Sequence, residues 1–206
     1  MASDLEHVAP QIVGMELTTP DEWPSLEVPT ELHFGIETAL LDIAGKASKC
    51  SVTALQSGKS RSIPVNALIA VKEPEEAWAK ASNLVSEGFT TLKVKVGIGN
   101  SEDDRKLVSG IRETVGPDVL LRLDPNQAWG VKESIDNINN LAQYNIEYVE
   151  QPIPARDIEG LRHVRGEVGV PIAVDEAIET VEDLHRLLEA EAADVFIIKA
   201  GRLGGL

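Results

Sequence analysis

Five charged residues fall at nearly even intervals along this chain, each at or near the end of a short apolar run: Lys95, Asp124, Glu150, Asp175 and Lys199. The intervals between them are 29, 26, 25 and 24 residues. A strand, a crossover helix and the next parallel strand need about 30 residues, so this spacing predicts one charged group per β/α unit. In a parallel barrel such groups converge at the carboxyl ends of the strands. Three carboxylates flanked by lysines would suit a divalent cation that faces general bases.

Two lysines lie close together in the run Leu-Lys-Val-Lys-Val-Gly. Lys93 and Lys95 are two residues apart, so on a strand both side chains project from the same face. Neighbouring ammonium groups repel each other and burial disfavours charge, so we expect a lowered pKa for this pair. A neutral amine can then act as a general base. The alternative is that both are solvated lysines on an edge strand. The apolar Leu92, Val94 and Val96 alternate with the lysines, a pattern that also fits a barrel strand whose lysines face the centre.

Acidic residues follow three successive apolar runs. Any one of Asp124, Glu150 and Asp175 alone would more often be a helix-capping or loop acid. Together they supply the hard oxygen ligands that Mg²⁺ prefers, with room left for water and substrate. Asn126 lies two residues after Asp124 and would face the same side, where it could orient a ligand or bind a substrate oxygen.

Three further residues are candidates for supporting roles. Gln151 and Glu176 each directly follow a candidate ligand and are interpreted as partners that hold the ligands in place, with exposed polar positions as the alternative. Lys199 follows four apolar residues, which argues against an ordinary exposed position. A lysine with a buried stem and an exposed ammonium group also fits the pattern. In a barrel, Lys199 would lie across from Lys93 and Lys95 with the metal between them. Amines on opposite sides of one α-carbon can remove a proton from one face and return it to the other.

The elements that must position these groups alternate strictly between strand and helix. Strands are predicted over the apolar runs at 62–70, 91–97, 119–126, 146–152, 171–176 and 194–200. Helical stripes lie between them, with Gly88 as a predicted helix end and Ser101 as a predicted N-cap. A further helix is predicted from Thr30, and residues 1–30 are interpreted as mostly irregular.

This alternation predicts an α/β fold with a parallel sheet. The sequence contains six predicted strands, whereas a closed TIM-type barrel has eight. An open doubly wound sheet is the alternative. Charged groups on strand after strand, instead of at one switch point, favour a partial TIM-type (β/α) barrel of about six units.

Composition argues against several classes of partner. With 34 acidic and 19 basic residues among 206, the formal charge is −15, which disfavours nucleic-acid and anionic-membrane partners. Cys50 is the only cysteine, so no intrachain disulfide can form. The first residues lack a leader pattern, and no apolar stretch is long enough to span a membrane. We therefore expect a soluble, cytoplasmic protein with one good core or one domain and part of another.

Five motifs in order resemble the enolase superfamily, in its muconate-lactonizing-enzyme subgroup: LKVKVG, RLDPNQAW, VEQP, AVDE and IIKAGRLGGL. The resemblance implies that one divalent cation, Mg²⁺ or in its place Mn²⁺, is bound by Asp124, Glu150 and Asp175. It further implies that Lys95 is the base, that Lys93 tunes it, and that Lys199 is the opposing acid/base or cationic stabiliser.

By this resemblance the reaction removes a proton α to a carboxylate on a small-molecule substrate, through an enediolate that Mg²⁺ stabilises. Within the subgroup the chain is most similar to o-succinylbenzoate synthases of menaquinone biosynthesis, which are lyases that eliminate water from a cyclohexadiene carboxylate. Dipeptide epimerases and N-acylamino acid racemases share the same lysines and ligands and are the alternative. A catalytically inactive fragment is a third alternative.

The resemblance also predicts the domain organisation. Complete members have an N-terminal capping domain, two more barrel units and a closing C-terminal segment. We therefore expect residues 1–61 to be a partial capping domain and residues 62–206 an incomplete barrel domain, truncated at both ends. A dimer or larger assembly would be usual for such barrels.

Overall fold

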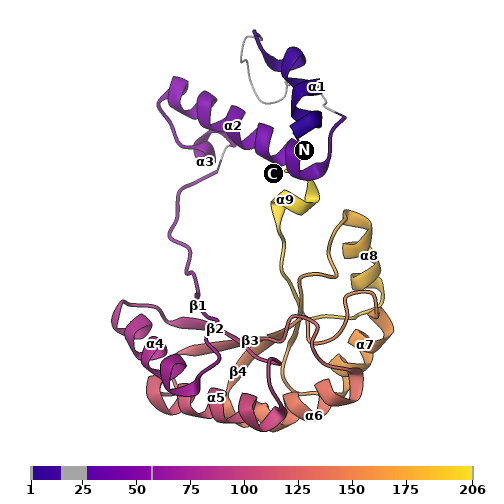
Figure 1. The fold of residues 1–206 in the computed structure, drawn as a ribbon. Helices are drawn as coiled ribbons and strands as arrows, with labels where there is room; N and C mark the ends of the chain where they lie inside the picture. The colour runs from indigo at the N-terminus through magenta and orange to yellow at the C-terminus, as the bar shows by residue number, and fades with distance from the viewer. Residues whose placement is uncertain (1, 15–26, 57, 206) are drawn as a thin grey trace. The chain divides into compact units, whose positions relative to one another are not determined.

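The computed structural model describes residues 2–14, 27–56 and 58–205 (Figure 1). The chain divides into two compact units. The sheet unit comprises residues 64–198, and the helical unit comprises residues 1–63 together with residues 199–206.

The sheet unit is built on parallel strands that follow one another in chain order. Within the described residues the sheet has six strands in the order β1 to β6, all paired in parallel. They are β1 (Ala67–Ile69), β2 (Thr91–Lys95), β3 (Leu120–Asp124), β4 (Ile146–Glu150), β5 (Ile172–Val174) and β6 (Val195–Phe196). Every predicted strand is present but shorter than its apolar run. An order that never reverses is typical of a (β/α) barrel wall and not of a doubly wound sheet.

Helices connect the strands. They are α4 (Pro74–Ser86), α5 (Ser101–Val115), α6 (Val131–Leu141), α7 (Ile158–Glu167) and α8 (Val181–Glu189), with a 3₁₀ turn, η2 (Ala142–Tyr144), after α6. Figure 1 shows α4 to α7 along one side of the sheet, where each helix packs against the next. In β2 the fully buried Leu92 and Val94 alternate with Lys93 and Lys95, which are only half-buried. The lysines therefore face away from the buried apolar face of the strand.

Local signals set the helix ends. The N-cap of α5 is Asn100, whose side chain accepts hydrogen bonds from the backbone N–H groups of Glu102 and Asp103. The prediction of Ser101 as the cap was therefore wrong, because the asparagine before it captures the free amides first. Gly88 follows α4 with a φ of +100°, which confirms the predicted helix end.

The helical unit contains α1 (Ala2–Ile12), α2 (Thr30–Ser48), α3 (Val52–Leu55) and α9 (Ala200–Leu203). The helix predicted from Thr30 is confirmed as α2, and His33 Nδ1 of that helix donates to the carbonyl oxygen of Gly204 at 2.6 Å. The prediction that residues 1–30 are mostly irregular was wrong for α1, where Val8 is buried. Residues 15–26 of that prediction lie outside the described residues.

Among residues 2–14, 27–56 and 58–205, no helix combines the length and the apolar character needed to cross a bilayer.

Candidate active site

Lysines and carboxylates meet at the carboxyl ends of β2, β3 and β4. Lys93 Nζ lies 2.8 Å from Asp124 Oδ2 and 2.7 Å from Glu150 Oε1. Lys95 Nζ lies 2.7 Å from the same Asp124 oxygen. Lys95 and Asp124 are register partners in the β2–β3 ladder, and register partners in neighbouring parallel strands project to the same face. Both lysines therefore share one face and one carboxylate.

The ion pairs of Lys93 shift its pKa in the direction opposite to the one expected. Burial alone lowers the pKa of Lys93, but hydrogen bonds and charge attraction from Asp124 and Glu150 outweigh burial and raise it above its usual value. The lowered pKa predicted for Lys93 was therefore wrong. The prediction rested on burial and on repulsion between the two lysines, whereas the structure also places carboxylates within reach of both.

The three candidate ligands are almost completely buried. Asp124, Glu150 and Asp175 are 1%, 1% and 3% exposed. Burial raises the pKa of Asp124, but Lys93 and Lys95 more than offset this and hold the pKa below its usual value. Burial also raises the pKa of Glu150; Asp124 and Asp175 add to the rise, and Lys93 offsets only part of it. Buried acids this close to one another are unfavourable unless cations share the site.

Asn126 reaches the site through a turn. Strand β3 ends at Asp124, and Asn126 has a φ of +47°, in the left-handed region. Its backbone N–H donates to Asp124 Oδ1 at 3.0 Å, and its side-chain Nδ2 donates to Glu176 Oε1 at 2.9 Å. Lys95 Nζ donates to Asn126 Oδ1. Asn126 thus lies beside Asp124, but the predicted reason was wrong, because strand alternation has already ended.

Gln151 joins the ends of β4 and β5. Its side chain is fully buried, so the exposed alternative does not apply to this residue. Oε1 accepts hydrogen bonds from the backbone N–H groups of Asp175 and Ala177, both at 3.1 Å. Nε2 donates to the carbonyl oxygen of Ile153 at 3.1 Å.

Lys199 lies just beyond β6. It is the N-cap residue of α9 and belongs to the helical unit. The strand that was predicted to reach this lysine ends earlier, at Phe196. The role of Lys199 opposite Lys93 and Lys95 therefore stays a prediction.

Hydrogen bonds link the loop after β3 to the loop after β4, and the sequence analysis did not predict these contacts. The backbone N–H of Gln127 donates to the carbonyl oxygen of Gln151 at 2.8 Å, and that of Trp129 donates to Pro152 at 3.1 Å. Gln127 Oε1 in turn accepts from the backbone N–H of Ala155 at 2.8 Å. Gln127 also has a positive φ, of 67°, which sequence periodicity does not reveal.

A second polar group on the same strands was also missed. Arg122 Nε lies 2.6 Å from Glu147 Oε2, and Arg122 Nη1 donates to Asn66 Oδ1 at 2.9 Å. The guanidinium lies 4.9 Å from the ring centroid of Tyr148. We call these four residues the Arg122 cluster. A signal for it existed, because Arg122 interrupts an apolar run two residues before Asp124 and so shares its face.

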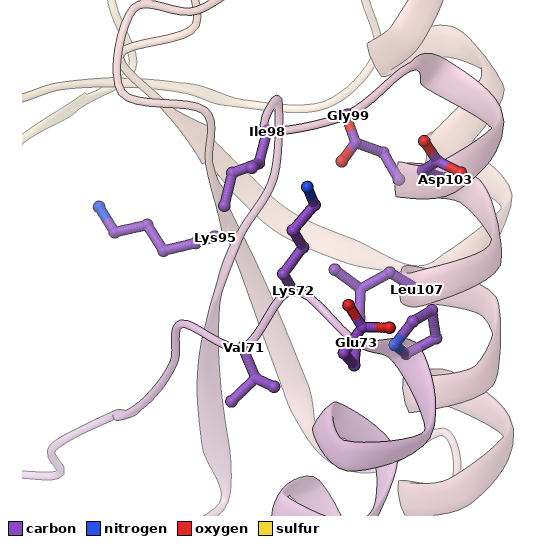
Figure 2. Close-up of a pocket in the computed structure, with 10 residues that line it drawn as sticks. Val71, Lys72, Glu73, Lys95, Ile98, Gly99, Asp103 and Leu107 are labelled. Carbon is purple, nitrogen blue, oxygen red and sulfur yellow. The ribbon is translucent and has the colours of Figure 1, made fainter.

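A pocket of about 180 Å³ opens beside Lys95, between the ends of β1 and β2 and the start of α5. Figure 2 shows Lys72 reaching into this space and the Lys95 side chain extending from the edge of the pocket away from it. Both oxygens of Asp104, which also lines the pocket, accept from the backbone N–H of Gly97 at 3.0 and 2.9 Å. The pocket lining is completed by Val71, Glu73, Pro74, Ile98, Gly99, Asp103 and Leu107. Lys95 belongs both to this pocket and to the group of carboxylates.

The donor chemistry of the strand ends fits a divalent cation. We call the charged groups there the strand-end cluster: the carboxylates of Asp124, Glu150, Asp175 and Glu176 and the ammonium groups of Lys93 and Lys95. Hard carboxylate oxygens of this kind suit Mg²⁺. Among the described residues, no three Asp, Glu, His or Cys side chains are grouped so that they could hold a metal ion as they stand. The ammonium of Lys93 bridges Asp124 and Glu150, so a bound metal would require these side chains to rearrange.

The parallel sheet and the acids and lysines at its strand ends define the chain as a (β/α) barrel protein with a polar site at the carboxyl ends of the strands. The chain belongs to the enolase superfamily: residues 76–206 match the family model described as enolase C-terminal domain-like.

Relatives within this family are enzymes. The hydrophobic dipeptide epimerase of Enterococcus faecalis is 39% identical over 171 residues, which cover 83% of this chain and 48% of that protein. The o-succinylbenzoate synthase of Thermobifida fusca is 43% identical over 146 residues, which cover 70% and 44%. The crystal structure of a dipeptide epimerase from Cytophaga hutchinsonii, complexed with Mg and the dipeptide D-Ala-L-Val, matches with a TM-score of 0.78 and 31% identity, covering 85% of this chain and 48% of that one. The chain thus spans about half the length of the curated relatives it matches.

Proposed function

We propose that this chain carries the metal-binding and proton-removing residues of an enzyme that abstracts a proton α to a carboxylate. In this proposal Asp124, Glu150 and Asp175 hold one Mg²⁺, for which Mn²⁺ can substitute. The observation that carries the proposal is that these three carboxylates are each 3% exposed or less and that Asp124 and Glu150 lie within 2.8 Å of the ammonium groups of Lys93 or Lys95. The Mg bound to the epimerase from Cytophaga hutchinsonii supports the same assignment.

The chemistry divides between the ion and the chain. When bound, the ion supplies a Lewis acid for the oxygen on which charge develops. Lys95 receives the α-proton at Nζ, which Asp124 and Asn126 orient through the hydrogen bonds described above. Lys93 stays charged between its two carboxylates and acts on Lys95 electrostatically.

Dehydration of a cyclohexadiene carboxylate to o-succinylbenzoate is the first candidate reaction. Lys95 removes the α-proton and then donates that proton to the hydroxyl group, which leaves as water, while Lys199 remains protonated beside the enolate. The 43% identity with the synthase of Thermobifida fusca supports this substrate class.

Epimerisation of a dipeptide, or racemisation of an N-acylamino acid, is the second candidate. Here Lys95 and Lys199 act on opposite faces of the same α-carbon, one removing the proton and the other returning one. The match to the epimerase of Enterococcus faecalis, which extends over more of this chain than the match to the synthase, supports this candidate.

One experiment separates the two candidates. The protein is incubated with Mg²⁺ in D₂O, first with the cyclohexadiene carboxylate and then with each enantiomer of a hydrophobic dipeptide. An aromatic ultraviolet spectrum indicates the lyase, and deuterium at Cα from both enantiomers indicates the epimerase. Lys95→Ala should abolish the aromatic product and the exchange from the enantiomer that Lys95 deprotonates, because it removes that base. Lys132→Ala, which changes an exposed lysine on α6, should leave both intact.

The proposal fails if Lys95→Ala still forms the aromatic product or still exchanges both enantiomers, since another group would then replace Lys95 as the base. Absence of both signals in a protein that binds Mg²⁺ would favour the third alternative, a catalytically inactive chain.

A further inference from the structure

Gln151 has an unusual backbone conformation at the end of β4. Its φ is +41°, a region that residues with a Cβ atom rarely occupy. Such a conformation persists only where surrounding contacts impose it, and such residues cluster at functional sites. Glu150, a buried member of the strand-end cluster, is its neighbour in the chain.

Every polar atom of this buried residue has a hydrogen-bond partner. The backbone N–H reaches β5 and the backbone oxygen reaches the loop after β3, while the side-chain amide uses both its oxygen and its nitrogen. The partners are the carbonyl of Ala173 (2.8 Å), the N–H of Gln127 (2.8 Å), the N–H groups of Asp175 and Ala177 (3.1 Å each) and the carbonyl of Ile153 (3.1 Å). One residue thus connects the ends of β3, β4 and β5.

We propose that Gln151 is a positioning residue that fixes the spacing between the carboxylates of Glu150 and Asp175. The inference rests on the proposed function, in which these two acids hold the same cation. Gln151 is covalently next to Glu150, and its Oε1 bonds the backbone N–H of Asp175. Gln151 therefore links the backbone of Glu150, through the peptide bond, to the backbone of Asp175, through the side-chain hydrogen bond. Its role is indirect, because it acts through the acids and touches neither substrate nor ion.

The chemistry of this position favours an amide over similar side chains. An apolar side chain of the same length would leave the N–H groups of Asp175 and Ala177 without their acceptor. A carboxylate would keep that acceptor, but it would lose the donor to Ile153 and add a negative charge beside Glu150 and Asp175. The amide meets both hydrogen-bonding demands and carries no charge.

The test uses Mn²⁺ alone as the probe, with binding measured by calorimetry and by the loss of free-ion electron paramagnetic resonance signal. Gln151→Met should weaken Mn²⁺ binding about 10- to 100-fold, the usual effect of removing a residue that orients a metal ligand. Gln127→Met is the matched control, because it also removes a side-chain oxygen that accepts a loop N–H, but one that does not reach β5. The control should bind Mn²⁺ with unchanged affinity, whatever it does to thermal stability.

Amide hydrogen exchange provides a readout that is independent of the metal. Exchange at Asp175 and Ala177 should accelerate in Gln151→Met and stay slow in Gln127→Met. Unchanged exchange at these two amides, or Mn²⁺ binding by Gln151→Met as tight as in the unaltered protein, would overturn the inference. If Gln151→Met does not fold, Gln151→Glu replaces it: this variant keeps the acceptor, so binding should be as tight or tighter, and a tenfold loss would count against the inference.

Failure of the proposed function gives a different result. If the unaltered protein binds no Mn²⁺, the metal site itself is rejected, and with it the role of Gln151 in cation binding. If the unaltered protein binds Mn²⁺ and both glutamine variants lose affinity equally, only the specific role of Gln151 is rejected.

Discussion

Two polar clusters on β3 and β4 differ in burial and in the sharing of charges. In the Arg122 cluster one guanidinium pairs with one carboxylate, the two side chains are 25% and 30% exposed, and an amide and an aromatic ring complete the surroundings. In the strand-end cluster Asp124 and Glu150 are each 1% exposed, and the ammonium of Lys93 lies between them. Ionised groups that are buried this deeply are costly for folding, and such groups cluster at functional sites.

Strand geometry alone does not create this difference. Arg122 and Asp124 lie two residues apart on β3, so both side chains project from the same face of the strand. What differs is the partner that each meets across the ladder. Arg122 pairs with Glu147 of β4, whereas Asp124 meets the two lysines of β2 and shares one of them with Glu150. The contrast predicts that substitutions in the two clusters have separable effects on metal binding and on stability.

The largest expected effect is on metal affinity. Glu150→Gln keeps the shape of the side chain but removes one charged ligand, so Mn²⁺ binding should weaken on the order of 100-fold. Glu147→Gln makes the same chemical change in the Arg122 cluster and should leave Mn²⁺ affinity unchanged. Calorimetric titration of both variants with Mn²⁺ checks this prediction. Equal losses in the two variants would mean that the clusters form one electrostatic site.

The next effect is on stability. Arg122→Met removes the partner of Glu147 and Asn66 and the cation that stacks on Tyr148. We expect the free energy of unfolding to fall by about 2 kcal/mol, less than for a fully buried pair because Arg122 and Glu147 are partly exposed. Urea denaturation measures this change. Mn²⁺ affinity should not change, and a large loss of affinity in this variant would contradict a purely structural role for the Arg122 cluster.

The sequence predicted the parts of this molecule that depend on local pattern. The strands follow from apolar runs and the end of α4 follows from Gly88, and the interval between charged residues predicted one acid or lysine per unit. Lys93 shows where this reasoning ends: its pKa depends on which carboxylates approach it from β3 and β4, and a single strand does not contain that information. Asn126 and Gln151 show the second limit, because left-handed turns that follow the strands set their contacts.

The smallest effect concerns a polar group outside both clusters. Thr180 caps α8: its Oγ1 accepts from the N–H of Asp183 at 3.1 Å and donates to Asp183 Oδ2 at 2.8 Å. Thr180→Ala should lower the free energy of unfolding by about 1 kcal/mol at neutral pH, as is typical for loss of an N-cap, and leave Mn²⁺ affinity unchanged.

The pH dependence of this effect has a definite sign. The hydrogen bond from the Thr180 hydroxyl holds the pKa of Asp183 below its usual value, so the ionised form stabilises the folded state above the unfolded pKa. This contribution is lost as the pH falls through the lowered folded pKa. Urea denaturation of Thr180→Ala and of the unaltered protein, at neutral pH and below the usual aspartate pKa of about 4, should show the difference between them shrinking in acid. A difference that grows in acid would show that the threonine stabilises the protonated carboxyl instead.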